Sequence, residues 1–70
     1  MKTIIKVHTN IGRTKLYDVE TYIETTIALV INGINLSHDN LIGKFVFPMS
    51  SIEHYNIYTV PDDFNITLLR

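Results

Sequence analysis

The stretch from Thr26 to Leu36 constrains the fold more than any other part of the chain, because it is the longest apolar run. Near its end lies the dipeptide Asn32-Gly33, whose residues accept the positive φ angles of a type I′ turn. Asn-Gly between apolar residues is the strongest short-range signal for a β-hairpin. The sequence therefore predicts a strand that doubles back at Asn32 and Gly33 and presents one almost wholly aliphatic face.

Most of the remaining chain alternates between apolar and polar residues, which is typical of half-buried strands. Gly12, the polar cluster at 37–40, Pro48 and Pro61 supply turn signals between these segments. A capping box of the Ser-x-x-Glu type adds a single helical turn near residues 50–54. The predicted strands are Lys2–Thr9, Thr14–Ile23, Thr26–Ile31, Leu41–Phe47, His54–Val60 and Asn65–Leu69.

Residues 19–31 support two interpretations. With Asp18 as N-cap and Gly33 just past the end, most of the apolar residues of 19–31 fall on one side of a helical wheel, although Ala28 falls on the other. Eight residues of this segment are β-branched, however, and such residues favour strands over helices. We favour two strands joined by a bend near Glu24-Thr25, and a helix at 19–31 in an α+β fold is the alternative.

Five or six short strands at intervals of about ten residues predict an all-β fold, either a small antiparallel barrel or a strongly curled sheet. No linker, repeat or low-complexity segment divides the chain, so residues 1–70 are expected to form a single domain. The alternating strand 41–47, the turn Phe-Pro-Met-Ser-Ser-Ile at 47–52 and the Tyr-rich strand after it resemble small SH3-like or Sm-like barrels in general architecture. The resemblance covers roughly the second half of the chain and carries over no functional residue.

Length and composition predict that the protein gains stability by assembling with other copies. A domain of 70 residues buries only about 60% of the surface that its unfolded chain exposes, so its core is thin. The chain has no Cys, which excludes disulfides and thiolate metal sites, and a homo-oligomer is the remaining way to add stability.

The net charge and the apolar pattern bear on partners and location. Six Lys and Arg against seven Asp and Glu give a formal charge of −1, which provides no overall attraction to nucleic acid or to an anionic membrane. No apolar run approaches the ~20 residues needed to span a bilayer. The first residues also lack the apolar region of a signal peptide, so we expect a cytoplasmic protein.

Side chains that often carry out catalysis or bind metals are scattered. His8, His38 and His54 lie in separate segments without the close pairing of a metal site, so no metal and no cofactor are expected. Ser50 and Ser51 have His54 nearby, but a small barrel offers no enclosed cleft for a nucleophilic triad. The sequence therefore predicts a protein that is not an enzyme.

The strongest candidate site is the segment Asn-Ile-Gly-Arg-Thr-Lys at 10–15. A tight turn containing Gly can point successive backbone amides outward as an anion-binding nest, to which basic side chains and a hydroxyl add charge and a donor. The alternative is a hairpin turn whose basic residues protect a sheet edge from aggregation. Tyr side chains of the last long strand can stack on bases or fill a partner's groove. The predicted ligand-binding residues are Asn10, Gly12, Arg13, Thr14, Lys15, Tyr55 and Tyr58.

These features favour a non-enzymatic binding protein that occupies or sequesters its partner. The partner is expected to be a protein surface or an anionic small ligand such as a nucleotide, and the protein an inhibitor of the kind that phages and other mobile elements encode. Two alternatives stay open. One is an RNA- or DNA-binding small β-barrel, suggested by Lys residues interleaved with Tyr, and the other is an accessory subunit of a larger complex.

Overall fold

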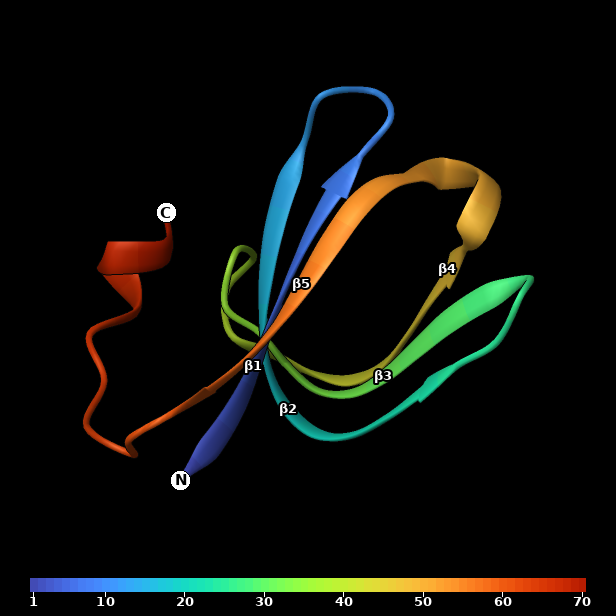
Figure 1. The fold of residues 1–70 in the computed structure, drawn as a ribbon. Helices are drawn as coiled ribbons and strands as arrows, with labels where there is room; N and C mark the ends of the chain where they lie inside the picture. Colours follow the sequence, from blue (N-terminus) through green and yellow to red (C-terminus); the bar gives the residue numbers. More distant parts are fainter.

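The structure, a computed structural model that describes all 70 residues, contains one sheet of five antiparallel strands (Figure 1). The strand order is β4-β3-β2-β1-β5, so the first four strands form a meander and β5 returns to pair with β1. The elements are β1 (Lys2–Thr9), β2 (Thr14–Glu24), β3 (Ala28–Asn35), β4 (Leu41–Pro48), β5 (Ile52–Val60) and two short 3-10 helices, η1 (Met49–Ser51) and η2 (Ile66–Leu69).

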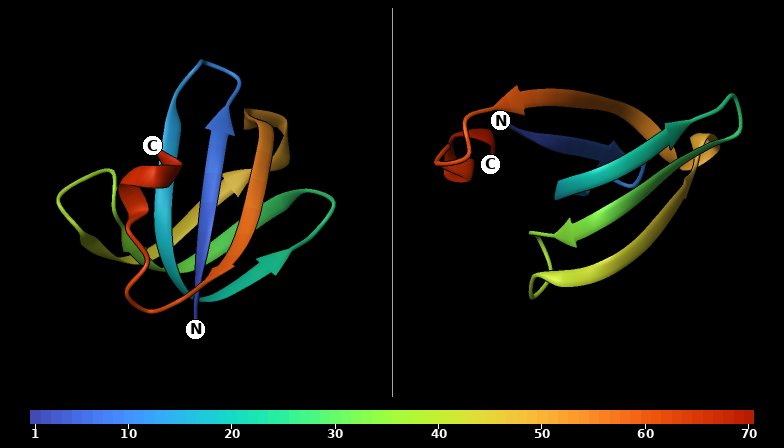
Figure 2. Two further views of the ribbon diagram at one scale, coloured as in Figure 1. Left: turned by 60° about the vertical axis from the view of Figure 1, so that its left-hand side comes forward. Right: turned by 90° about the horizontal axis from the view of Figure 1, so that it is seen from below.

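The sheet is strongly curled and does not close into a barrel. In Figure 2, β1 and β5 lie on one side of the curl and β3 and β4 on the other. The edge strands β4 and β5 do not pair with each other. The predicted all-β fold of five to six strands is therefore confirmed in its curled-sheet form. No helix in the structure has both the length and the apolar character that a membrane crossing requires.

Residues 19–31 are not helical, so the α+β alternative is wrong. They form the second half of β2, a tight turn and the first half of β3. Thr25 builds the turn, because its Oγ1 accepts hydrogen bonds from the amides of Ile27 at 3.3 Å and Ala28 at 3.0 Å. The bend predicted near Glu24-Thr25 is thus confirmed, and the β-branched composition of the segment outweighs its helical periodicity.

The hairpin predicted at Asn32-Gly33 is wrong, because both residues lie inside β3. Gly33 is needed there because β2 passes very close to it. A Cβ built on Gly33 would stand 2.1 Å from the carbonyl oxygen of Asp18 and 3.0 Å from the Cα of Val19. Because glycine has no side chain, the two strands can approach closely here. Gly33 therefore serves a close approach in the sheet and not the positive φ angle of a turn.

The turn between β3 and β4 lies at Asp39-Asn40 instead. Both residues have positive φ angles, 53° and 52°, as a type I′ turn requires. The turn closes with a hydrogen bond of 3.2 Å from the amide of Leu41 to the carbonyl of His38. Asn and Asp tolerate this left-handed conformation better than other residues with side chains, so no glycine is needed.

Each face of the curled sheet carries a hydrophobic cluster. The larger cluster, on the inner face, joins β1, β2 and β3 and is covered by partly buried side chains from β4, η1 and β5. The smaller cluster, on the outer face, lies under the segment that follows β5. The buried residues are Ile5, Val7, Tyr17, Val19, Leu29 and Ile31 on the inner face and Ile4, Leu16 and Val60 on the outer face.

The two short helices differ in part from the sequence predictions. A helical turn is present as η1, but Ser50 and Glu53 form no capping box, since β5 already begins at Ile52. The strand predicted at Asn65–Leu69 is wrong, because η2 forms there with Asn65 as its cap. Side chains spaced about three apart along this segment pack on the outer cluster, which is a helical spacing.

Because β2 and β3 approach so closely at Gly33, we expect the stability of the fold to be sensitive to any side chain at this position. Gly33→Ala should destabilise the fold by at least about 3 kcal/mol, because its Cβ would collide with backbone atoms that cannot move independently. Gly43→Ala in β4 is the matched control, since its nearest neighbour would be a side-chain atom of Phe45 at 4.0 Å. It should change stability by about 0.5 kcal/mol or less. Urea unfolding of both variants checks this, and equal losses would contradict it.

Candidate anion-binding site

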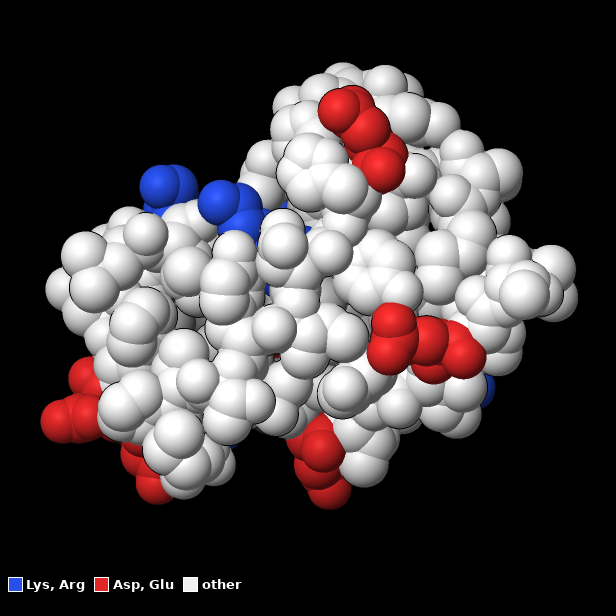
Figure 3. Space-filling view, viewed as in Figure 1, with Lys and Arg blue, Asp and Glu red and all other residues white.

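Positive charge gathers on one part of the molecule although the chain carries a formal net charge of −1. On the face drawn in Figure 3, Lys and Arg atoms come together beside the C-terminal end of the chain, and Asp and Glu atoms lie apart from them. Two pockets of the structure are lined by four of the six Lys and Arg residues and by no Asp or Glu. This region is therefore the candidate for binding an anion. The four basic residues are Lys6, Arg13, Lys15 and Arg70.

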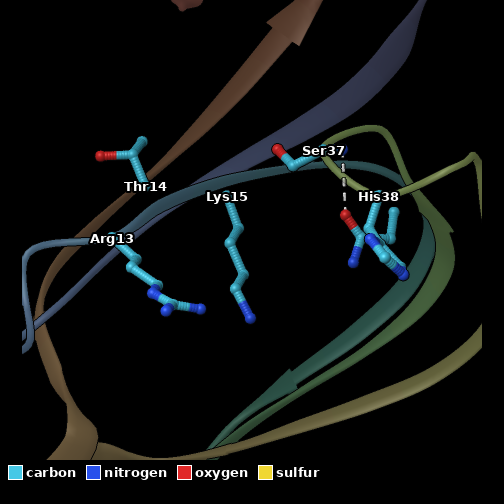
Figure 4. Close-up of a pocket in the computed structure, with 6 residues that line it drawn as sticks. Arg13, Thr14, Lys15, Ser37 and His38 are labelled. Carbon is cyan, nitrogen blue, oxygen red and sulfur yellow. Dashed lines mark hydrogen bonds between the residues drawn. The ribbon is translucent and has the colours of Figure 1, made fainter.

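The larger pocket is open, has a volume of about 510 Å³ and lies where the start of β2 meets the turn after β3 (Figure 4). No hydrophobic residue lines it. A ligand that binds there must therefore be held by charge and hydrogen bonds rather than by apolar contact. The lining residues are Arg13, Thr14, Lys15, Asn35, Ser37 and His38.

The pocket exists because β3 is shorter than β2 at this end of the sheet. Asn35, the last residue of β3, pairs with Tyr17, so Thr14 and Lys15 extend past the end of β3. The chain then turns along β2, where the hydroxyl of Ser37 accepts a hydrogen bond of 2.9 Å from the amide of Leu16. A side chain thus replaces the missing strand, and the space beside the first residues of β2 stays open.

The buried side chain of Asn35 and the exposed hydroxyl of Ser37 face this space. Asn35 is only 7% exposed, and its Oδ1 accepts a hydrogen bond of 3.0 Å from the amide of Ser37, which leaves its NH₂ group as a donor for a ligand. The hydroxyl of Ser37 accepts from Leu16, so its own hydrogen is available as well. In Figure 4 the side chains of Arg13 and Lys15 extend to the side of β2 on which His38 lies.

No carboxylate neutralises the two basic side chains of the pocket. The ion pairs of the structure lie elsewhere, among them the pair of Lys2 with Asp18, and none includes Arg13 or Lys15. Lys15 lies 6.0 Å from the centre of the Phe47 ring, a contact that favours its positive charge without cancelling it. The pocket can therefore offer two cationic donors to one anionic group.

The glycine turn before β2 shapes the site but is not an anion nest. Gly12 has a φ of 85°, and its amide donates to the carbonyl of Thr9 at 3.0 Å. The amide of Arg13 donates to the Thr9 hydroxyl at 3.2 Å. Asn10 holds the turn against η1 through a bond of 2.8 Å from its Nδ2 to the carbonyl of Ser50. These backbone donors are used within the turn, so the side chains of Arg13 and Lys15 carry the charge.

The two tyrosines predicted to bind a ligand lie away from the pocket. Tyr55 packs against the inner cluster, and its hydroxyl donates to the carboxylate of Glu24. This hydrogen bond, with a smaller effect of burial, raises the pKa of Tyr55. Tyr58 packs against the outer cluster. The structure thus brings Arg13, Thr14 and Lys15 together and leaves Asn10, Gly12, Tyr55 and Tyr58 outside the pocket.

Three lining residues were not predicted, namely Asn35, Ser37 and His38. Their signal in the sequence is the polar cluster after the apolar run, which is typical of a turn. The polar cluster lies beside Thr14 and Lys15 only because β3 continues straight through Asn32-Gly33. A hairpin at Asn32-Gly33, as predicted, would have put the cluster in a different position.

The other two histidines meet on the outer face of the sheet. The rings of His8 and His54 stack with their centres 4.9 Å apart, and both lie within 4 Å of the carboxylate of Glu53. His8 also shares a hydrogen bond of 2.8 Å with the hydroxyl of Thr14. No group of three or more His, Cys, Asp or Glu side chains is arranged to hold a metal ion.

Comparisons with known protein families, with curated proteins and with solved structures found no match to this chain. The SH3-like or Sm-like architecture therefore stays a prediction of general resemblance. The function must be argued from the chemistry of the pocket itself.

The buried Tyr17 of the inner cluster leads us to expect that the fold loses stability at alkaline pH. Tyr17 is 1% exposed, its ring lies 5.0 Å from that of Phe45, and burial raises its pKa to about 12. In the unfolded chain the same hydroxyl ionises near pH 10, at about its unperturbed pKa. Stability should therefore be full below pH 10 and fall as the pH rises toward 12, by up to about 2 to 3 kcal/mol.

Urea unfolding between pH 8 and pH 12 measures this loss of stability. Tyr17→Phe removes the ionising group, so most of the decline should disappear in that variant even though its stability at pH 8 changes as well. A decline of the same size in Tyr17→Phe and in the wild type would contradict the role of this hydroxyl.

Proposed function

We propose that the protein is a non-enzymatic binding protein that holds a small anionic ligand, of the phosphate-bearing class that includes nucleotides, in the pocket between β2 and the β3–β4 turn. The single observation that carries this proposal is the pair of basic side chains, Arg13 and Lys15, which face a pocket lined only by polar and charged residues and have no carboxylate partner. Charge-assisted hydrogen bonds from such donors to phosphate oxygens are among the strongest polar contacts in proteins.

The arrangement supports binding rather than conversion of the ligand. The hydroxyl of Ser37 is held by the amide of Leu16, and no hydrogen bond joins it to His38 as a base. The Thr14 hydroxyl shares a hydrogen bond with His8, which lies outside the pocket, and no hydroxyl is hydrogen-bonded to a base that itself lines the pocket. The site therefore has the donors for recognition and lacks the usual set for group transfer. Such a protein acts by sequestering its ligand. The proposal includes a cytoplasmic location.

A binding site for single-stranded nucleic acid is the weaker proposal. Stacking of bases on aromatic side chains is the usual source of that affinity, and neither pocket is lined by an aromatic residue other than His38. The tyrosines that suggested nucleic acid, Tyr55 and Tyr58, pack against the two hydrophobic clusters instead.

Self-association is a second part of the proposal, and its surface is the outer face of β2, β3 and β4. Ile23, Ile42 and Val46 are exposed there by 58%, 82% and 57%. The strand register places Ile23 beside Val30 and Val30 beside Val46, and it places Ile42 beside Ile34 further along β4, with Lys44 between Ile42 and Val46 on the same face. We call these aliphatic side chains the patch. Because β4 is an edge strand with unpaired backbone groups, a second copy can pair with it antiparallel and cover the patch at the same time.

The anion site predicts specific losses of affinity. Adenosine 5′-monophosphate and inorganic phosphate should shift the amide signals of residues 13–15 and 35–38 in an NMR titration at low salt. Arg13→Gln and Lys15→Gln should each weaken binding roughly tenfold, because each removes one charged contact. Lys44→Gln on β4 is the matched control, since Lys44 is exposed, unpaired and lines neither pocket.

Three results would contradict the anion-binding proposal. They are the absence of any shift in the wild type, an equal loss in Lys44→Gln, and tighter binding of an oligothymidylate than of the mononucleotide at 150 mM salt. The last result would favour the nucleic-acid alternative.

The patch predicts a dimer. Size-exclusion chromatography with light scattering should give twice the chain mass at 50 μM, and Ile42→Glu should convert the protein to a monomer by placing a charge in the apolar contact. Ile11→Glu is the control, because Ile11 is 75% exposed but lies in the β1–β2 turn. A monomeric wild type, or an Ile42→Glu variant that stays dimeric, would contradict the proposed surface.

A further inference from the structure

A second pocket lies on the outer face of the sheet, with a volume of about 380 Å³. It shares two lining residues, Thr14 and Ser37, with the pocket described above. Its remaining lining residues are Lys6, Leu16 and Arg70. The two pockets are therefore neighbours that meet at the hydroxyl groups of Thr14 and Ser37.

The two pockets open on opposite faces of the same sheet. Lys6 pairs with Leu16 across β1 and β2, so both side chains point to the face opposite that of Lys15. Figure 4 shows the same division, because the hydroxyls of Thr14 and Ser37 lie on one side of the β2 ribbon and the side chains of Arg13 and Lys15 extend to the other. Thr14 pairs with His8 of β1 on one side, but no strand lies on its other side after β3 ends, so an elongated ligand can pass around this edge of the sheet.

The outer pocket is also positively charged and unneutralised. Neither Lys6 nor Arg70 forms an ion pair with a carboxylate. Arg70 is held over the pocket by a hydrogen bond of 3.0 Å from its Nη2 to the carbonyl of Leu36, and η2 positions it by packing on the outer cluster. Each face of the sheet thus presents two basic side chains on either side of a rim formed by two hydroxyls.

We infer that the ligand carries two anionic groups separated by a polar linker, with one group in each pocket and the linker across Thr14 and Ser37. This inference rests on the proposed function and names its ligand class as a sugar or nucleoside bisphosphate. Two phosphates with four basic partners balance the local charge that the protein leaves uncompensated. The Ser37 hydroxyl, whose hydrogen is free to donate, meets the oxygen atoms of a sugar at the rim.

The position of the rim excludes a pyrophosphate as the preferred ligand. The phosphates of a pyrophosphate share one bridging oxygen and are too close together to reach opposite faces of a β-sheet. A sugar between the two phosphates supplies both the length and the hydroxyl chemistry that the rim matches.

Isothermal titration with adenosine 3′,5′-bisphosphate, adenosine 5′-monophosphate and inorganic pyrophosphate tests the inference. The bisphosphate should bind one per chain and on the order of 10²-fold more tightly than the monophosphate, because its second group binds intramolecularly. Pyrophosphate should lack this advantage. Lys6→Gln and Arg70→Gln should each lower the bisphosphate affinity roughly tenfold, whereas Lys44→Gln should leave it unchanged.

The outcomes separate this inference from the function on which it rests. Bisphosphate that binds no more tightly than the monophosphate, binds two per chain, or is unaffected by Lys6→Gln and Arg70→Gln overturns the bridging ligand and leaves the pocket of Arg13 and Lys15 intact. Binding of none of the three compounds to the wild type overturns both proposals. Unchanged thermal unfolding midpoints for the variants confirm that the losses reflect binding.

Discussion

The close contact of β2 with β3 at Gly33 determines the shape of the molecule. Glu20 is bulged out of the pairing between Val19 and Thr21, and such a bulge bends a strand and increases its twist. With no side chain at Gly33 to hold the strands apart, β3 and β4 turn back over the inner face. Phe45 and Phe47 of β4 then reach the cluster formed by the first three strands. One curled sheet can therefore build its own core without a second layer.

The same curl leaves the site at the end of the sheet where the strands have unequal lengths. Because β3 stops at Asn35, the first residues of β2 have no strand on that side, and side chains from a turn fill the role of a partner. Basic side chains that would otherwise be spread along three segments are held around this gap. Like charges held close together repel one another, so an arrangement without Asp or Glu side chains is a cost to the fold that a bound anion would offset.

Local patterns in the sequence predicted the parts of the fold that local interactions determine. The hairpin of β1 and β2, the bend before Ala28 and the long strands β4 and β5 follow from alternation and turn residues. The error at Asn32-Gly33 has a physical cause, since glycine serves both a positive φ and a close approach, and a sequence window cannot tell which. Only the path of β2 shows that Gly33 serves the second purpose. Asp39-Asn40 then forms the turn with less favourable residues because the core already requires a full-length β3.

In the candidate site, too, the residues that follow one another in the sequence were predicted, and the residues that come from distant segments were not. Arg13, Thr14 and Lys15 could be predicted because they follow one another in a basic turn, whereas Asn35, Ser37 and His38 join them only through the pairing of β2 with β3. No local sequence pattern predicts the charge of the second pocket, because Lys6 comes from the first strand and Arg70 from the end of the chain. A net charge of −1 argues against an anionic partner only if charges are spread evenly, and folding separates them here. The local charge of this region is therefore a property of the fold, which places four of six basic side chains around one edge of the sheet and keeps every Asp and Glu side chain out of the pocket linings.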